Sequence, residues 1–131
     1  MEQKKVLIVD DEIHIVHVVA IKLRNNGYEV VSANNGAEAY ELACEVNPDI
    51  IVTDYQMPVM TGMELVEQLR KNEQTKNIPV IMLTARSFAI SKEQQEHLMI
   101  SECLSKPFSP RELLINIEDI LYQNQVVAEA K

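Results

Sequence analysis

Short apolar runs rich in β-branched residues alternate with longer amphipathic segments along the chain, and this alternation constrains the fold more than any other feature. Between the runs, apolar residues recur at helical spacing, as in the segment 12–26. Strands that alternate with helices pair in parallel, because each crossover is long enough to hold a helix. Since the runs are apolar along most of their length, helices should cover both faces of the sheet, which predicts a three-layer α/β sandwich. The five predicted strands lie at 6–10, 28–33, 49–54, 78–83 and 102–105.

Helix starts are marked by capping residues. Thr61 followed by Glu64 has the spacing of a capping box, and Ser91 precedes a short fourth helix. Ser109 with Pro110 starts the last of five predicted helices, because proline is favoured at the first helical position.

Composition and charge are those of one ordinary globular domain. Of 131 residues, 47% are hydrophobic and 24% charged, so we predict a single domain over 1–131, with a core at about 4–124 and a frayed tail at 125–131. No apolar run is long enough for a membrane span or the core of a secretory signal, so we expect a cytoplasmic protein without membrane contact. The net charge of −8 argues against direct nucleic-acid binding, which depends on Lys and Arg.

Counts of glycine and cysteine exclude two further classes of site. Alternation alone does not fix the strand order, and a Rossmann-like order is the competing topology. Its glycine-rich phosphate cradle is missing, however, because Gly27, Gly36 and Gly62 are the only glycines. Cys44 and Cys103 lack metal-site spacing and are too few for a disulfide framework, so we expect free thiols packed as small apolar side chains.

Polar side chains stand where the predicted strands end. Each has an ordinary explanation alone: a helix cap, a turn acid, a β-forming threonine or a solvated lysine. Ligands of open α/β sheets bind at the carboxyl ends of the strands, so the joint occurrence of these residues at one edge favours a functional site. Asp10 and Asp11 follow the first strand, Asp54 ends the third, Thr84 follows the fourth and Lys106 follows the fifth.

Three converging carboxylates require a counter-charge. Two unit negative charges about 4 Å apart repel by roughly 4 kcal/mol at an effective dielectric constant near 20. Oxygen ligands without imidazole or thiolate favour Mg2+, which bridges carboxylates to phosphate oxygens. We therefore predict phosphoryl chemistry, with Mg2+ held by Asp10, Asp11 and Asp54. Asp54, which stands alone on the middle strand, is the predicted nucleophile, while Lys106 supplies counter-charge and Thr84 donates its hydroxyl to a phosphoryl oxygen.

Four motifs follow one another at the ends of the predicted strands: Val9-Asp10-Asp11-Glu12, Asp54-Tyr55-Gln56-Met57-Pro58-Val59-Met60-Thr61-Gly62, Thr84-Ala85 and Lys106-Pro107-Phe108. In this order, they resemble the motifs of the response-regulator receiver domains of two-component signalling. The resemblance covers about residues 4–124. It implies a flavodoxin-like fold with a five-stranded parallel sheet of order 2-1-3-4-5.

The resemblance also implies a role for each site residue. Asp54 would accept a phosphoryl group from a phosphohistidine on a sensor histidine kinase or a histidine phosphotransfer protein. Mg2+ would contact Asp11, Asp54 and the backbone carbonyl of Gln56, with Asp10 acting through water. Lys106 would pair with the phosphoryl group, and the Lys106–Pro107 peptide would be cis.

Such a domain is a switch, and it catalyses only its own phosphorylation and dephosphorylation. The resemblance places the downstream contact on the face of the fourth helix, fifth strand and fifth helix, near Phe88, Ile90 and Met99. Since these 131 residues hold no second domain, we expect the output to be recruitment of another protein, onward phosphotransfer or phosphate storage.

Two features of the sequence depart from the family's pattern. Cys103 stands three residues before the lysine, where the family usually has a Tyr or Phe that swings inward when the threonine hydroxyl moves. Met99-Ile100 replaces the favoured Gly-Ala, so we expect that turn to be built differently.

Gln56 and Arg86 flank the site, and we hypothesise that Arg86 limits attack by water on the acyl phosphate.

Two alternative functions remain open. A degenerate receiver would dock partners without phosphorylation, although the intact set of site residues argues against it. A small phosphohydrolase of the haloacid-dehalogenase type also uses a nucleophilic aspartate, but it needs Asp-x-Asp after its first strand. The sequence Asp10-Asp11-Glu12 does not supply that motif.

Overall fold

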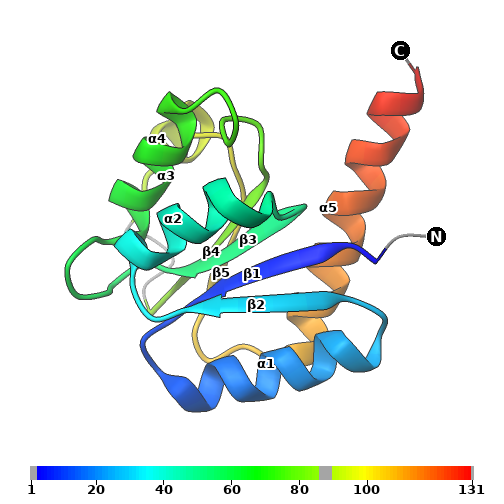
Figure 1. Ribbon diagram of the computed structural model, residues 1–131, viewed down its shortest axis with the longest axis horizontal. Coiled ribbons are helices and arrows are strands. Elements are labelled where there is room, and N and C mark those ends of the chain that lie inside the picture. The colour runs from blue at the N-terminus through cyan, green and yellow to red at the C-terminus, as the bar shows by residue number, and fades with distance from the viewer. Residues whose placement is uncertain (1–2, 86–89, 131) are drawn as a thin grey trace.

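The computed structural model describes residues 3–85 and 90–130, the last six of them as backbone only. Within these residues, five strands form one parallel sheet in the order β2-β1-β3-β4-β5, which confirms the predicted order and excludes the Rossmann-like alternative. Helices α1 and α5 cover one face of the sheet, and α2, α3 and α4 cover the other (Figure 1). The elements are β1 (Lys5–Val9), α1 (Ile13–Asn25), β2 (Glu29–Ala33), α2 (Gly36–Val46), β3 (Ile50–Asp54), α3 (Gly62–Lys71), β4 (Val80–Thr84), α4 (Lys92–His97), β5 (Ile100–Ser105) and α5 (Pro110–Ala130).

The core consists of two apolar layers, one on each face of the sheet. Alternate residues of a strand point to opposite faces, so Leu7 of β1 packs in one layer and Ile8 in the other. The first layer is closed by α2 and α3, for example by Leu65. The second is closed by α1 and α5, for example by Leu23 and Ile117. All five residues of the central strand β3 are buried, as its continuous apolar run predicts.

The predicted helix starts are confirmed. At α3 and α4 the cap is reciprocal: the N-cap hydroxyl accepts a backbone N–H, and the side chain three residues on accepts the N-cap N–H. These boxes pair Thr61 with Glu64 and Ser91 with Gln94, and at α5 the Ser109 hydroxyl accepts the Glu112 N–H at 3.0 Å.

Two element ends differ from the prediction. Helix α5 continues to Ala130, into the segment 125–131 for which a frayed tail was predicted; its alanines and glutamate are strong helix formers. Strand β5 begins at Ile100, two residues earlier than predicted. Its pairing with β4 shifts by one residue, so that Ser101 is skipped between two consecutive pairs. That extra residue interrupts the regular alternation of side chains at the start of the strand.

The turn from α4 into β5 is stabilised by Arg70 at the end of α3. Its guanidinium donates four hydrogen bonds to backbone carbonyls, those of Lys76, Ile78, Leu98 and Met99, at 2.7 to 3.1 Å. Met99 itself adopts a left-handed conformation, with φ of 55°. One side chain thus ties together the segments that lead into β4 and β5.

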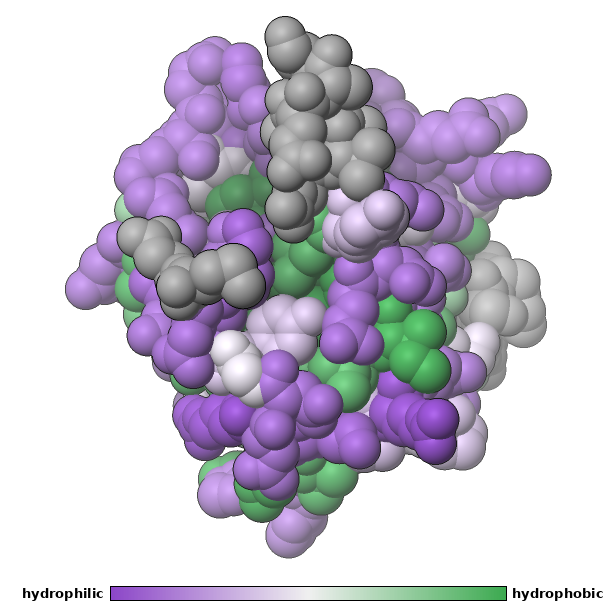
Figure 2. Space-filling view, turned by 90° about the vertical axis from the view of Figure 1, so that its right-hand side faces the viewer, coloured by the Kyte–Doolittle hydropathy of each residue, from purple (hydrophilic) through white to green (hydrophobic). Residues whose placement is uncertain are grey.

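The surface at the amino ends of the strands is polar. Figure 2 shows this side of the molecule, on which hydrophilic side chains predominate and hydrophobic ones appear in small groups between them. Among the described residues, no helix combines the length and the apolar character that a bilayer crossing needs. The distinctive chemistry of the molecule lies at the other end of the sheet.

Candidate functional site

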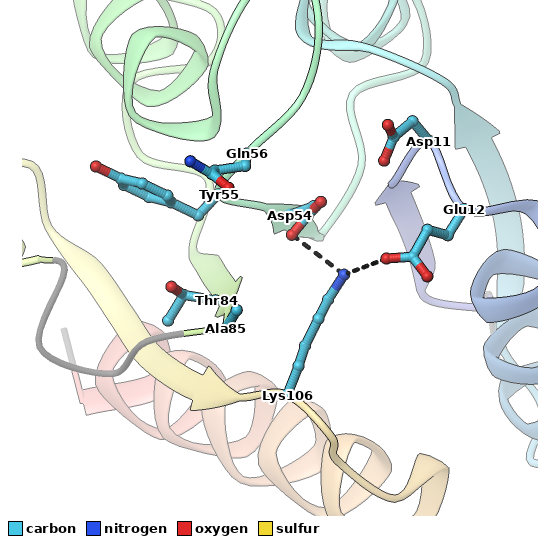
Figure 3. Close-up of a pocket in the computed structure, with 8 residues that line it drawn as sticks. All are labelled: Asp11, Glu12, Asp54, Tyr55, Gln56, Thr84, Ala85 and Lys106. Atoms are coloured by element: carbon cyan, nitrogen blue, oxygen red, sulfur yellow. Dashed lines mark hydrogen bonds and ion pairs between the residues drawn. The ribbon is translucent and has the colours of Figure 1, made fainter.

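A pocket of about 680 Å³ lies at the carboxyl ends of the strands. Strand β1 ends at Val9, so the acidic residues that follow it reach this edge, and Asp54 and Thr84 are the last residues of β3 and β4. The edge is held together by backbone bonds between neighbouring strand ends, such as that from Lys106 N–H to the Thr84 carbonyl at 2.8 Å. The pocket is lined by Asp11, Glu12, Asp54, Tyr55, Gln56, Thr84, Ala85 and Lys106 (Figure 3).

Three carboxylates converge at this edge of the sheet, as predicted. Asp10, Asp11 and Asp54 each offer one carboxylate oxygen, and these oxygens lie within 4.8 Å of one another. Asp10 is completely buried, the Asp54 side chain is 9% exposed, and Asp11 is exposed. A set of oxygen donors that includes two buried acids fits a hard divalent cation.

Burial has the largest effect on the pKa values of the two buried acids, Asp10 and Asp54. It raises the pKa of Asp54 to about 6, and the negative charge of Asp10 adds to this effect while Lys106 opposes it. Burial also raises the pKa of Asp10, although the Glu12 backbone N–H and Lys106 hold it down in part. The two acids therefore disfavour being ionised together, a cost that a bound cation removes.

Lys106 supplies the positive charge of the pocket. Its Nζ lies 3.1 Å from Asp10 Oδ2, 3.2 Å from Glu12 Oε1 and 3.2 Å from Asp54 Oδ1. Burial alone would lower its pKa, but hydrogen bonds and charges from Asp10 and Asp54 outweigh this and raise it. The predicted pairing of Lys106 with Asp54 is confirmed, and its peptide bond to Pro107 is cis.

Thr84 and Gln56 line the same pocket as Asp54. In Figure 3, Thr84 lies on one side of Asp54, while Asp11 and Glu12 lie on the other. The Thr84 side chain is buried at the end of β4. Of the residues that the sequence assigned to the site, those that the structure describes thus come together.

The loop between β3 and α3 approaches the site closely. At Gly62, a Cβ would collide with the backbone oxygen of Asp54 and would lie 2.8 Å from Met82 Sδ, so only glycine fits. Val59 has φ of 72° and is 83% exposed. The Met60 N–H bonds back to the Pro58 carbonyl at 2.8 Å, which makes this a strained γ-turn.

The predictions for residues outside the pocket are confirmed only in part. Cys44 and Cys103 are free, as expected, but each is half-buried rather than fully buried. Burial and the neighbouring Glu102 raise the pKa of the Cys103 thiol. Ile90 belongs to the core, and Met99 is 54% exposed. Arg86 and Phe88 lie outside the described residues, so their assigned roles stay predictions.

Glu12 is the site residue that the sequence analysis did not single out. Its carboxylate contacts Lys106 and lines the pocket. The available signal was its position directly after the acidic pair, where a third acid follows the first strand. Sequence spacing alone did not show that its side chain turns back toward the lysine.

Comparison with known proteins gives a consistent description. The sequence profile described as "response regulator receiver domain" matches residues 6–118. The phosphate regulon transcriptional regulatory protein PhoB of Pseudomonas aeruginosa is 38% identical over 92% of this chain and 53% of its own length. The alkaline phosphatase synthesis transcriptional regulatory protein PhoP of Bacillus subtilis is 38% identical over 95% of this chain and 51% of its own length. The chain therefore spans about half the length of these relatives.

Solved structures agree on the fold. The chemotaxis protein CheY4 of Vibrio cholerae superimposes with a TM-score of 0.84 at 38% identity, and the match covers 90% of this chain and 98% of that one. A response regulator from Chloroflexus aurantiacus superimposes with a TM-score of 0.84 at 32% identity, covering 92% and 99%. The flavodoxin-like fold expected from the sequence is thus confirmed.

Proposed function

This chain belongs to the response-regulator receiver domain family, and from that premise we propose that Asp54 accepts a phosphoryl group. The donor is a phosphohistidine on a sensor histidine kinase or a histidine phosphotransfer protein. The observation that carries the proposal is the position of Asp54, which ends the middle strand beside two further acids, with Lys106 at 3.2 Å. Receiver domains act as signalling switches, and we propose that this one acts through protein contacts.

The donor set fits Mg2+ as the resident cation. Asp10, Asp11 and Asp54 offer oxygen ligands, and the backbone carbonyl of Gln56 is the proposed fourth group. A magnesium ion held there would neutralise charge on the phosphoryl oxygens during transfer. The raised pKa of the two buried acids supports this assignment, because both are easier to ionise beside a cation.

The transfer step uses this chain's residues as follows. A carboxylate oxygen of Asp54 attacks phosphorus and forms an O–P bond while the N–P bond of the phosphohistidine breaks. The leaving nitrogen keeps that electron pair. Lys106 donates an N–H to one phosphoryl oxygen, and the Thr84 hydroxyl donates to another. With a pKa of about 6, Asp54 is mostly ionised near pH 7, as a nucleophile must be.

The proposed output surface is formed by α4, β5 and α5. These elements carry exposed apolar residues: Met99 before β5, at 54% exposure, and Ile115 and Tyr122 on α5, at 47% and 69%. Cys103 on β5 is too small to move into space beside Thr84 as an aromatic ring would. The signal is therefore proposed to reach this surface by displacement of Thr84 itself.

The proposal is tested by incubating the protein with MgCl2 and acetyl phosphate and measuring its intact mass. We expect one phosphoryl adduct on the wild type and on Asp119→Ala, which removes an exposed aspartate of α5. Asp54→Ala should show none, and EDTA should abolish the adduct on the wild type. An unmodified wild type, or an equal adduct on Asp54→Ala, would refute the proposal.

A further inference from the structure

Glu12 closes a ring of interactions around the site lysine. Its backbone N–H donates to Asp10 Oδ1 at 2.9 Å, Asp10 Oδ2 accepts from Lys106 Nζ at 3.1 Å, and Lys106 Nζ donates to Glu12 Oε1 at 3.2 Å. The backbone part of this ring survives any substitution of the Glu12 side chain except proline. The contact between the Glu12 carboxylate and the ammonium can therefore be removed selectively.

The Glu12 carboxylate could cap helix α1 but does not do so. Glu12 is the N-cap residue of α1, where a carboxylate can accept a free N–H of the first helical turn. Its side chain makes no such bond, and its carboxylate turns to Lys106 instead. Glu12 and Lys106 also line both the acidic pocket and a neighbouring apolar groove that contains Phe108, so their pair separates the two.

Building on the proposed function, we propose that Glu12 is a positioning residue that holds Lys106 in the unphosphorylated protein and competes with the phosphoryl group for it. A lysine ammonium has three N–H donors, and here three carboxylates surround it at 3.1 to 3.2 Å. A phosphoryl group on Asp54 brings new oxygens that need the same donors. The donor that contacts Asp54 passes to one of these oxygens, which lies beyond the Asp54 carboxylate. The ammonium must move toward it, so one of its two other contacts, to Asp10 or to Glu12, is given up.

Exposure decides which contact is lost. The Asp10 side chain is 0% exposed, so water cannot replace Lys106 there, and loss of the ammonium would leave the buried charge dependent on the bound cation alone. The Asp54 contact is replaced by contacts to the phosphoryl group that it carries. The Glu12 side chain is 60% exposed, so water can replace the ammonium at little cost. Glu12 therefore releases Lys106 when the phosphoryl group arrives.

Removal of the Glu12 charge should favour the phosphoryl-bound state. In Glu12→Gln, we expect phosphorylation by acetyl phosphate at saturating MgCl2 to be about two- to fivefold faster, the range that an exposed ion pair allows. Binding of beryllium fluoride with MgCl2, which mimics the phosphoryl group, should tighten by a similar factor in calorimetry. Glu45→Gln is the matched control, because it removes an exposed glutamate near the end of α2 and should change neither quantity.

A second variant separates positioning from simple charge repulsion. Glu12→Asp keeps the negative charge but withdraws the carboxylate by one methylene group, away from Lys106. If Glu12 acts by holding Lys106, the phosphorylation rate and the beryllium fluoride affinity of Glu12→Asp should shift toward those of Glu12→Gln. If Glu12 acts only by charge repulsion, both should equal the wild-type values. Circular dichroism and the thermal unfolding midpoint confirm that each variant is folded.

The possible failures can be told apart. If the wild type takes no phosphoryl group and binds no beryllium fluoride, the proposed function and this inference both fall. If the wild type does both, the inference alone is overturned by unchanged or slower phosphorylation of Glu12→Gln, by unchanged beryllium fluoride affinity, or by wild-type behaviour of Glu12→Asp.

Discussion

Asp54 carries an electrostatic cost in the folded protein. Its side chain is 9% exposed and lies near a second buried acid, Asp10. Burial and that neighbouring charge raise its pKa from 3.8 to about 6. Between about pH 3.8 and pH 6, the Asp54 carboxyl is therefore mostly protonated in the folded protein and mostly ionised in the unfolded chain. Stability from this residue is fully present below about pH 3.8 and is lost as the pH rises through about 6.

Replacement of Asp54 by asparagine should remove this cost. In EDTA at pH 7, we expect Asp54→Asn to be more stable than the wild type, by roughly 2 to 3 kcal/mol at most. The gain should shrink toward pH 4, where the wild-type carboxyl is protonated. Urea unfolding at both pH values measures it, with Asp119→Asn as control. A variant that is equally destabilised at both pH values would contradict the raised pKa.

At the scale of single residues, the sequence predicted which residues form the site but not all the contacts between them. Asp10, Asp11, Asp54 and Lys106 were found because each follows or ends a predicted strand, and parallel strands bring their ends to one edge. The role of Glu12 was not found. Its contact depends on the backbone conformation at the start of α1, with φ of −89° and ψ of 101°, which residue types do not specify.

At the scale of elements, the turn from α4 to β5 contains a strained residue. Met99 has φ of 55°, a conformation that costs L-residues roughly 1 to 2 kcal/mol. Its side chain is 54% exposed, so it contributes little packing. The hydrogen bond from Arg70 to its carbonyl helps to hold the turn in place.

Glycine at this position should therefore be stabilising. We expect Met99→Gly to raise the free energy of unfolding by about 0.5 to 1 kcal/mol, because relief of strain exceeds the added backbone entropy of the unfolded chain. Met99→Ala is the control, since it removes the side chain but keeps the Cβ and the strain. If the two variants are equally stable in urea unfolding, the left-handed backbone is not the cause.

Element boundaries were predictable where side chains determine them. The caps at Thr61 and Ser91 were predicted because a hydroxyl and an acceptor three residues later satisfy free N–H groups locally. The start of β5 was missed because its pairing with β4 contains a register shift beside Ile100. Such a shift depends on the neighbouring strand and leaves no local pattern.

At the scale of the whole molecule, the site exists only when the sheet is complete. Its acids, hydroxyl and ammonium come from the ends of four strands, β1, β3, β4 and β5. The unfolded chain cannot bring these groups together, so a cation bound by them stabilises the folded state alone.

Magnesium should therefore raise the stability of the protein. At a Mg2+ concentration one hundred times the dissociation constant, we expect a gain of about 2.7 kcal/mol and a higher unfolding midpoint. EDTA should reverse the gain. Asp11→Asn should remove most of it, because Asp11 is an exposed member of the carboxylate set and its loss leaves the core intact. An equal gain in that variant would place the cation elsewhere.

Alternation of strands and helices predicted the parallel sheet and its covering layers, because those follow from the length of each crossover and the apolar strands. It did not predict the strand order. That order came with the resemblance of the motifs, since several orders bury the same apolar faces. The agreement between the observed strand order and the expected one therefore rests on the motifs alone.

The four hydrogen bonds of Arg70 have a mechanical consequence. They join the segments that enter β4 and β5, at residues 76 to 78 and 98 to 99, so these two strands share an anchored end. Their other ends carry Thr84 and lead to Lys106. One arginine side chain therefore sets the position of both strands relative to each other at the end of the sheet opposite the site.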